Sequence, residues 1–140
     1  MQTVHSSPLL KFALLIDAVV SGAMGVLQLS AAAALATLLE LPQAVLLGTG
    51  EFLVVYALLL VGLATRARLW SALVMFIVLG NALWALACVA LLAASTLAPN
   101  ALGAVFVLLQ AVAVVVFAAL EWRGLRTSAP AGAAAGTVLS

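Results

Sequence analysis

Residues 44–64 have the sequence AVLLGTGEFLVVYALLLVGLA, in which Glu51 is the only charged side chain. A helix rises about 1.5 Å per residue, so a stretch of this length crosses a hydrocarbon core of about 30 Å. Three more stretches have a similar length and apolar character, and they cover about residues 9–29, 69–92 and 101–122. The sequence therefore predicts an all-α integral membrane protein, folded as a four-helix bundle with short loops.

The composition of the 140-residue chain excludes several classes of protein. Hydrophobic residues make up 68% of the chain and charged residues 6%, against about 45–50% and about 25% in a soluble domain. So few charges cannot cover a water-facing surface, which excludes a soluble enzyme and a disordered protein. The net charge of +1 provides no field that would attract nucleic acid, so we expect no nucleic-acid partner.

The segments outside the four spans have different expected structures. Residues 1–8 form a polar N-terminal stub that we expect to be frayed up to the helix start, where Ser7 is the cap and Pro8 the first helical residue. Residues 30–43 are rich in Ala and Leu and predict a short helix, at the membrane interface or folded back along the bundle. Residues 123–140 are expected to be a disordered cytoplasmic tail.

The basic residues predict the orientation of the chain. If the chain crosses the membrane four times, all five fall on one side: Lys11, Arg66, Arg68, Arg123 and Arg126. The positive-inside rule places this side, and both termini with it, in the cytoplasm. For a bacterial source this predicts a multi-pass protein of the cell inner membrane.

Two carboxyl groups, Asp17 and Glu51, lie inside predicted spans and away from the last turn of each span. A charged group at the bilayer centre costs roughly 2.5–3.5 kcal/mol, so both should face the bundle interior, be protonated or have partners. Helical rise places Glu51, Asn81 and Gln110 at a similar depth, roughly 18–20 Å from the cytoplasmic helix ends. We expect these three to form a hydrogen-bonded cluster or to line a small pocket near Trp84.

Asp17 is predicted at a shallower level, close to Ser21 and Tyr56. Tyr56 lies about 140° around its helix from Glu51, so the two can face different grooves. The candidates for ligand binding or proton titration are Glu51, Asn81, Trp84, Gln110, Asp17, Ser21 and Tyr56. Each has a structural alternative: amide side chains join helices in membranes, and a carboxyl near the interface can reach water.

Small residues mark the faces through which the helices are expected to pack. Ser21 and Gly25 form a small-xxx-small pair that lets another helix approach closely, within the chain or in a dimer. Gly48 lies on the polar stripe of the second span. Gly103 lies on that of the fourth, which also carries Glu121. The stripes predict a bundle with an inward-facing polar seam.

Three short motifs fall within residues 19–63, and they are Ser21-Gly22, Leu41-Pro42 and Gly48-Thr49-Gly50-Glu51. Together they resemble the DoxX-like family of small bacterial four-helix membrane proteins. That family commonly has Ser-Gly in its first helix, a Gly-x-Pro or Leu-Pro loop, and Gly-x-x-Glu in its second helix. Some of its members are subunits of thiosulfate:quinone oxidoreductases. The resemblance implies a role in a membrane redox system, and Glu51 is the polar residue that it carries over.

Cysteine and histidine are too scarce for several kinds of chemistry. The single cysteine, Cys88, excludes an internal disulfide, and the single histidine, His5, lies in the polar N-terminal stub. Soft and borderline metals need clustered Cys and His, so we expect no metal site. No catalytic mechanism follows from these residues, and we expect a non-catalytic role.

Three hypotheses for the function remain open. The first is an accessory subunit of a membrane redox system that binds a quinone or a lipid, with a membrane partner subunit or a second copy. The second is a small proton-coupled transporter that uses Glu51 or Asp17. The third is a structural or assembly protein whose polar residues only fix helix packing.

Overall fold

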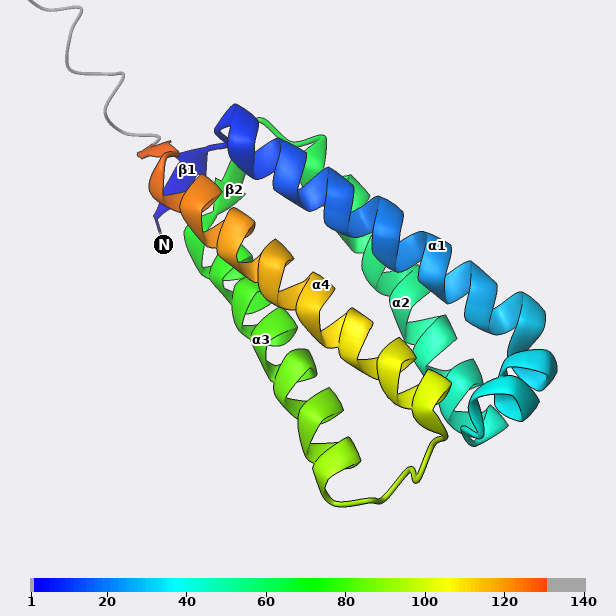
Figure 1. The fold of residues 1–140 in the computed structure, drawn as a ribbon. Coiled ribbons are helices and arrows are strands. Elements are labelled where there is room, and N and C mark those ends of the chain that lie inside the picture. The colour runs from blue at the N-terminus through cyan, green and yellow to red at the C-terminus, as the bar shows by residue number, and fades with distance from the viewer. Residues whose placement is uncertain (1, 131–140) are drawn as a thin grey trace, which may run out of the picture.

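The computed structural model describes residues 2–130, which form four long helices and one small sheet (Figure 1). The helices are α1 (Pro8–Leu39), α2 (Gln43–Ala64), α3 (Ser71–Ala93) and α4 (Ala101–Arg126). The strands are β1 (Thr3–His5), β2 (Arg68–Trp70) and β3 (Ala129–Pro130). All four helices are long and apolar enough to cross a membrane, so the predicted four-helix architecture is confirmed.

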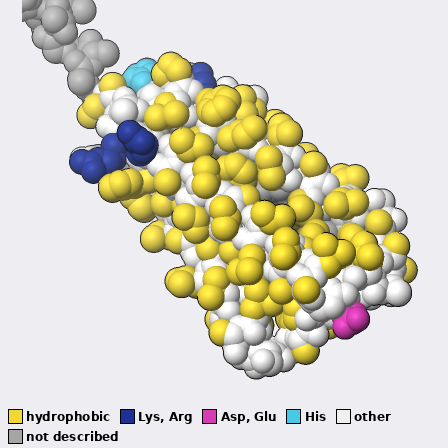
Figure 2. Space-filling model, viewed as in Figure 1, with side chains coloured by type: hydrophobic (Ala, Val, Ile, Leu, Met, Phe, Trp, Pro, Cys, Tyr) yellow, Lys and Arg dark blue, Asp and Glu magenta, His cyan; other side chains and the backbone are white. Residues whose placement is uncertain are grey.

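The surface of the bundle is apolar along its length. Phe76 and Leu58 are 72% and 68% exposed. Figure 2 shows apolar side chains over most of the visible face, with basic side chains at one end and an acidic one at the other. A water-soluble protein rarely exposes so large an apolar area. This surface is that of a multi-pass membrane protein.

Helix α1 begins as predicted and runs further than predicted. Ser7 accepts a hydrogen bond from the Leu10 amide at 3.1 Å, and Pro8 is in the first turn. The helix bends at Ala31, whose φ of −123° and ψ of 21° are not helical, and ends at Leu39. The short helix expected over residues 30–43 is therefore the last part of α1, which turns away from the main axis in Figure 1.

The three strands form an antiparallel sheet with β1 in the centre. Val4 pairs with Leu69 of β2, and His5 pairs with Ala129 of β3. Val4 and Leu69 are buried, so the strands cap the apolar core as well as pairing their backbones. The prediction of a frayed N-terminal stub is therefore wrong.

The expected tail over residues 123–140 is also partly ordered. Residues 123–126 complete α4, and residues 129–130 form β3. The remainder of the predicted tail, residues 131–140, lies outside the described residues. The sheet brings the start of the described chain and its last residues to the same end of the bundle, called the sheet end below (Figure 1).

The helices pack unequally around the bundle. Helix α1 packs against both α2 and α4, and α3 packs against α4. A Cβ atom added at Gly25 would lie 2.9 Å from the Gly50 carbonyl oxygen, so these glycines let α1 and α2 approach closely. A Cβ atom added at Gly103 would collide with the Leu39 carbonyl oxygen, so this glycine lets α4 approach the end of α1. Gly48 has no such role within residues 2–130, because an added Cβ would meet nothing within 4 Å.

Candidate functional site

Polar side chains from all four helices meet inside the bundle near the sheet end. They are Asp17 and Ser21 of α1, Tyr56 of α2, Asn81 of α3 and Glu121 of α4. Asp17 and Glu121 are completely buried, and Ser21 and Asn81 are at most 5% exposed. We call these five residues the carboxyl cluster. Buried polar groups in membrane helices usually pair with one another, and these five residues link all four helices.

Asp17 accepts hydrogen bonds from three of the helices, its own included. The Ser21 hydroxyl donates to Oδ1 at 2.7 Å, one turn further along α1. The Tyr56 hydroxyl and the Asn81 Nδ2 both donate to Oδ2, at 3.0 Å and 2.9 Å. Asp17 is therefore the best-satisfied carboxyl of the cluster.

Asn81 joins the two carboxyl groups. Its Nδ2 donates to Glu121 Oε2 at 3.2 Å as well as to Asp17. Its Oδ1 lies 3.1 Å from the Tyr56 hydroxyl, which also lies within reach of Asp17. Because a tyrosine hydroxyl has one proton, Tyr56 donates to one of these two acceptors at a time.

Glu121 is incompletely satisfied. Its Oε1 is buried and has no hydrogen-bond partner among the described residues. The groups that donate to the two carboxyls are Ser21, Tyr56 and Asn81, all uncharged. The cluster thus places two acids in the interior of the bundle and surrounds them with neutral donors.

The cluster borders a large cleft between α2 and α3. The cleft has a volume of about 500 Å³, and its walls are mainly apolar, with Phe76 and Leu83 among them. Ser21, Tyr56 and Asn81 also line it, so the same side chains face both the cleft and the buried acids. A ligand in the cleft can therefore hydrogen-bond directly to the cluster.

A row of aromatic rings runs along this cleft from α2 to α3. Phe52 stacks on Tyr56 with ring centroids 5.9 Å apart, and on Trp84 with centroids 5.3 Å apart. Both pairs are within 8° of parallel. The row lines the cleft with three aromatic side chains, of which Tyr56 also bonds the carboxyl cluster.

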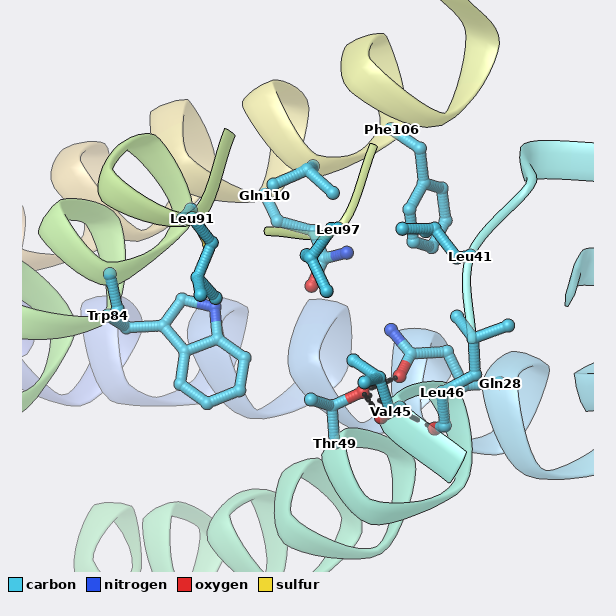
Figure 3. A pocket seen from close by; sticks show the side chains of 13 residues that line it. Gln28, Leu41, Val45, Leu46, Thr49, Trp84, Leu91, Leu97, Phe106 and Gln110 are labelled. Atoms are coloured by element: carbon cyan, nitrogen blue, oxygen red, sulfur yellow. Dashed lines mark hydrogen bonds between the residues drawn. The ribbon is translucent and has the colours of Figure 1, made fainter. Parts of the chain in front are cut away.

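A smaller cavity of about 190 Å³ lies toward the other end of the bundle (Figure 3). Gln110 points its amide into it, with Trp84 on one side and Phe106 on the other. The Thr49 hydroxyl donates to Gln28 Oε1 at 2.5 Å at the edge of this space. Trp84 lines this cavity, the cleft and a third space of about 230 Å³, so one indole separates all three.

The predicted level of Asp17, Ser21 and Tyr56 is confirmed by their hydrogen bonds. The predicted grouping of Glu51, Asn81 and Gln110 is wrong. Asn81 belongs to the carboxyl cluster, and Gln110 lines the small cavity instead. The two therefore serve different parts of the bundle.

Glu51 lies on the exposed side of α2. The stripe expected to face inward is exposed as a whole: Ala44, Gly48, Glu51, Val55, Leu58 and Gly62. The buried face of α2 is instead the row that contains Gly50 and Ala57. These small residues let α1 approach closely, and close packing is the main drive for helix association in lipid.

Glu121 is the cluster residue that the choice of candidates missed. It lies beside Trp122 near the end of α4, where a charged side chain is unremarkable in a membrane helix. The available signal was its spacing from Val114 and Ala118, which puts it on the buried face of α4.

Comparisons of this chain with protein-family models, with curated proteins and with solved structures find no match. The resemblance to the DoxX-like family therefore stays a prediction. The case for function rests on the carboxyl cluster, the cleft and the aromatic row.

Proposed function

We propose that this protein binds a lipophilic small molecule of the quinone or lipid class in the cleft between α2 and α3. In this role it is a non-catalytic accessory subunit of a membrane redox system, as the DoxX-like resemblance implies. The observation that carries the proposal is the position of Tyr56 and Asn81, which line the cleft and also bond the buried carboxyls.

The dimensions and walls of the cleft suit a quinone headgroup. Small-molecule sites usually have about 300–1,000 Å³, apolar walls and a few convergent polar groups, and the cleft has about 500 Å³. A flat ring can stack on the row of Phe52 and Trp84. A carbonyl oxygen on that ring can accept a hydrogen bond from the Tyr56 hydroxyl.

The location of the cleft suits a ligand dissolved in the bilayer. The residues around it include strongly exposed apolar side chains, such as Phe76 and Leu83. These side chains belong to the part of the surface that faces lipid in a membrane. A lipophile can therefore enter from the side, without passing through water.

The proposed orientation places both termini in the cytoplasm and the protein in the inner membrane. The N-terminal strand β1, the Arg68-bearing β2 and the end of α4 meet at the sheet end. Basic residues gather at that end, as Figure 2 shows, and the positive-inside rule assigns it to the cytoplasm. The bend at Ala31 places the last part of α1 at the opposite end, where we propose that it lies at the interface.

Proton-coupled transport is a second candidate, favoured by one observation. Two buried acids, Asp17 and Glu121, lie in one hydrogen-bonded cluster. Ionisable groups inside membrane helices often mark proton pathways. Asp17 rather than Glu51 is then the titrating candidate, since Glu51 is exposed on the outside of α2.

Fluorescence of Trp84 tests the proposed site. The chain has three tryptophans, so the double variant Trp70→Phe, Trp122→Phe leaves Trp84 as the only indole. A short-chain quinone such as decylubiquinone quenches a nearby indole, and we expect saturable quenching in reconstituted protein. Non-saturable quenching, as from simple partition into lipid, would contradict the site.

A matched pair of glycine variants places the ligand. Gly80 lines the cleft, Gly62 does not, and neither has an atom within 4 Å of an added Cβ among the described residues. Gly80→Leu fills the cleft and should weaken quinone binding by about tenfold or more, a loss of about 1.4 kcal/mol. Gly62→Leu should leave it unchanged. Equal affinity in the two variants would place the ligand outside this cleft.

A further inference from the structure

The two acids of the carboxyl cluster have no positively charged hydrogen-bond donor in the cluster. Asp17 and Glu121 are completely buried, and their hydrogen-bond donors are uncharged. Two ionised carboxylates in one buried site repel each other, and neither keeps the stabilisation that it has from hydration in water. A bound cation, of which the proton is the smallest, removes that penalty.

The hydrogen-bond donors of the cluster are all in use. Both hydrogens of Asn81 Nδ2 go to the two carboxyls, and the Ser21 hydroxyl goes to Asp17. The Tyr56 proton goes to Asp17 or to Asn81. Glu121 Oε1 is left buried and unpartnered, although a carboxylate oxygen in that position would require a donor.

We propose that the pair Asp17–Glu121 is a proton-binding site, with Asp17 ionised and one proton held on the Glu121 carboxyl. Asp17 keeps the charge because three donors stabilise it. Glu121 takes the proton because its Oε1 receives no hydrogen bond. The proton lowers the charge of the cluster from two negative charges to one.

The surrounding titratable groups are few. Helix α1 presents Asp17, α2 presents Tyr56, α4 presents Glu121, and α3 presents Asn81, which does not titrate. Along the chain, the next charged residues toward the sheet end are half-buried Lys11 and exposed Arg123. Glu121 is about one and a half turns from the end of α4, and Asp17 about two and a half turns from the start of α1, so Glu121 is the acid nearer to its helix end.

The second part of the inference rests on the proposed function and links this proton to the ligand. Tyr56 shares its single proton between Asp17 and Asn81 while it faces the cleft. A ligand oxygen that accepts a hydrogen bond from the Tyr56 hydroxyl removes one donor from Asp17. Asp17 then competes for the proton of Glu121, so ligand binding and the position of the proton are coupled.

Carbon-13 NMR of the full chain in lipid vesicles tests the proton site without any ligand. Asp17 is the only aspartate, so aspartate labelled at its side-chain carboxyl reports this residue alone. Labelled glutamate reports Glu121 alone in the variant Glu40→Gln, Glu51→Gln. Near neutral pH we expect an ionised Asp17 and a protonated Glu121. Two ionised or two protonated carboxyls would overturn the proposal, and a sodium-dependent shift would assign the site to a metal cation instead.

Infrared spectra provide an independent check with the cluster mutated. The protonated carboxyl band, identified by its shift in heavy water, should be present in Glu51→Gln and absent when Glu121→Gln is added to it. An unchanged band in this folded double variant would overturn the assignment. If Glu121→Gln does not fold, the NMR measurement on the native cluster still decides.

Addition of decylubiquinone to the labelled protein tests the coupling separately. We expect the Asp17 and Glu121 signals to shift in the parent chain and to stay fixed in Gly80→Leu. Quinone binding with unchanged carboxyl signals would overturn the coupling but leave the binding site intact. Absence of quinone binding, with a protonated Glu121, would overturn the proposed function alone.

Discussion

The two halves of the bundle use their polar residues differently. In the half toward the sheet end, side chains from all four helices converge on Asp17 and Asn81. In the other half, called the loop end, the polar contact between Thr49 and Gln28 borders a cavity of about 190 Å³. The sheet-end half thus holds its polar side chains in one hydrogen-bonded network beside the cleft, while the loop end has a single polar contact beside a separate cavity.

The difference shows how a chain with few polar groups obtains both a fixed and an adaptable region. Apolar side chains alone distinguish poorly between neighbouring helices and lipid, so specific hydrogen bonds and close contacts must fix the helix positions. At the sheet end the cluster provides these contacts for all four helices. Toward the loop end such contacts are fewer, and a cavity of about 190 Å³ lies between the helices.

Replacement of Asn81 should have the largest effect on this comparison. Asn81→Leu removes the amide that bonds both buried acids, and we expect it to lower the free energy of unfolding by about 3 kcal/mol. Gln110→Leu at the loop end should cost at most about 0.6 kcal/mol. Unfolding in mixed micelles measures both. Equal losses would show that the two halves are stabilised alike.

Gly103 tests whether the loop end is loose throughout. Its position lies directly beneath the Leu39 carbonyl, so the added methyl of Gly103→Ala must push α1 and α4 apart. We expect a loss of about 2 kcal/mol in the same unfolding measurement. Gly62→Ala has open space in the described structure and should be neutral or stabilising by up to about 1 kcal/mol. A small effect of Gly103→Ala would mean that this contact yields easily.

The sequence predicted the spans well and the inward faces poorly, for a physical reason. Length and hydropathy identify helices of about 20 residues, because only a helix satisfies its own backbone in lipid. They do not identify the buried face, since lipid and protein interior are equally apolar. In α2 the buried face follows Gly50 and Ala57 rather than Glu51.

The depth of a residue along its helix was predictable, because it does not depend on which face of the helix is buried. Counting residues from the helix ends placed Asp17, Ser21 and Tyr56 at one level, and they do bond one another. The sheet was beyond prediction, because three-residue strands have too few positions to show an alternating pattern. Its register depends on contacts between residues far apart in the chain, such as Val4 and Leu69.

One hydrogen bond from each half provides a finer comparison. Ser21→Ala removes a donor to the buried Asp17 carboxyl and should cost about 1.5 kcal/mol. Thr49→Val removes the bond to Gln28, but the single proton of this hydroxyl is shared between Gln28 and the Val45 carbonyl of its own helix, so we expect about 0.6 kcal/mol. Thermal unfolding in detergent measures the two. A larger loss for Thr49→Val would place the tighter polar contact at the loop end.

Glu51→Gln should have the smallest effect on the isolated chain. Glu51 is exposed on the outer side of α2, and surface substitutions away from networks usually change stability by less than about 0.5 kcal/mol. Native mass spectrometry of wild type and variant should show the same retained lipophile, because the cleft is lined by other residues. Loss of the lipophile in Glu51→Gln would move the ligand to the outer face of α2. Loss of a dimer with the lipophile retained would instead assign Glu51 to contact with a second copy of the chain. In such a contact a lipid-facing carboxyl can gain a hydrogen-bond partner from the other copy.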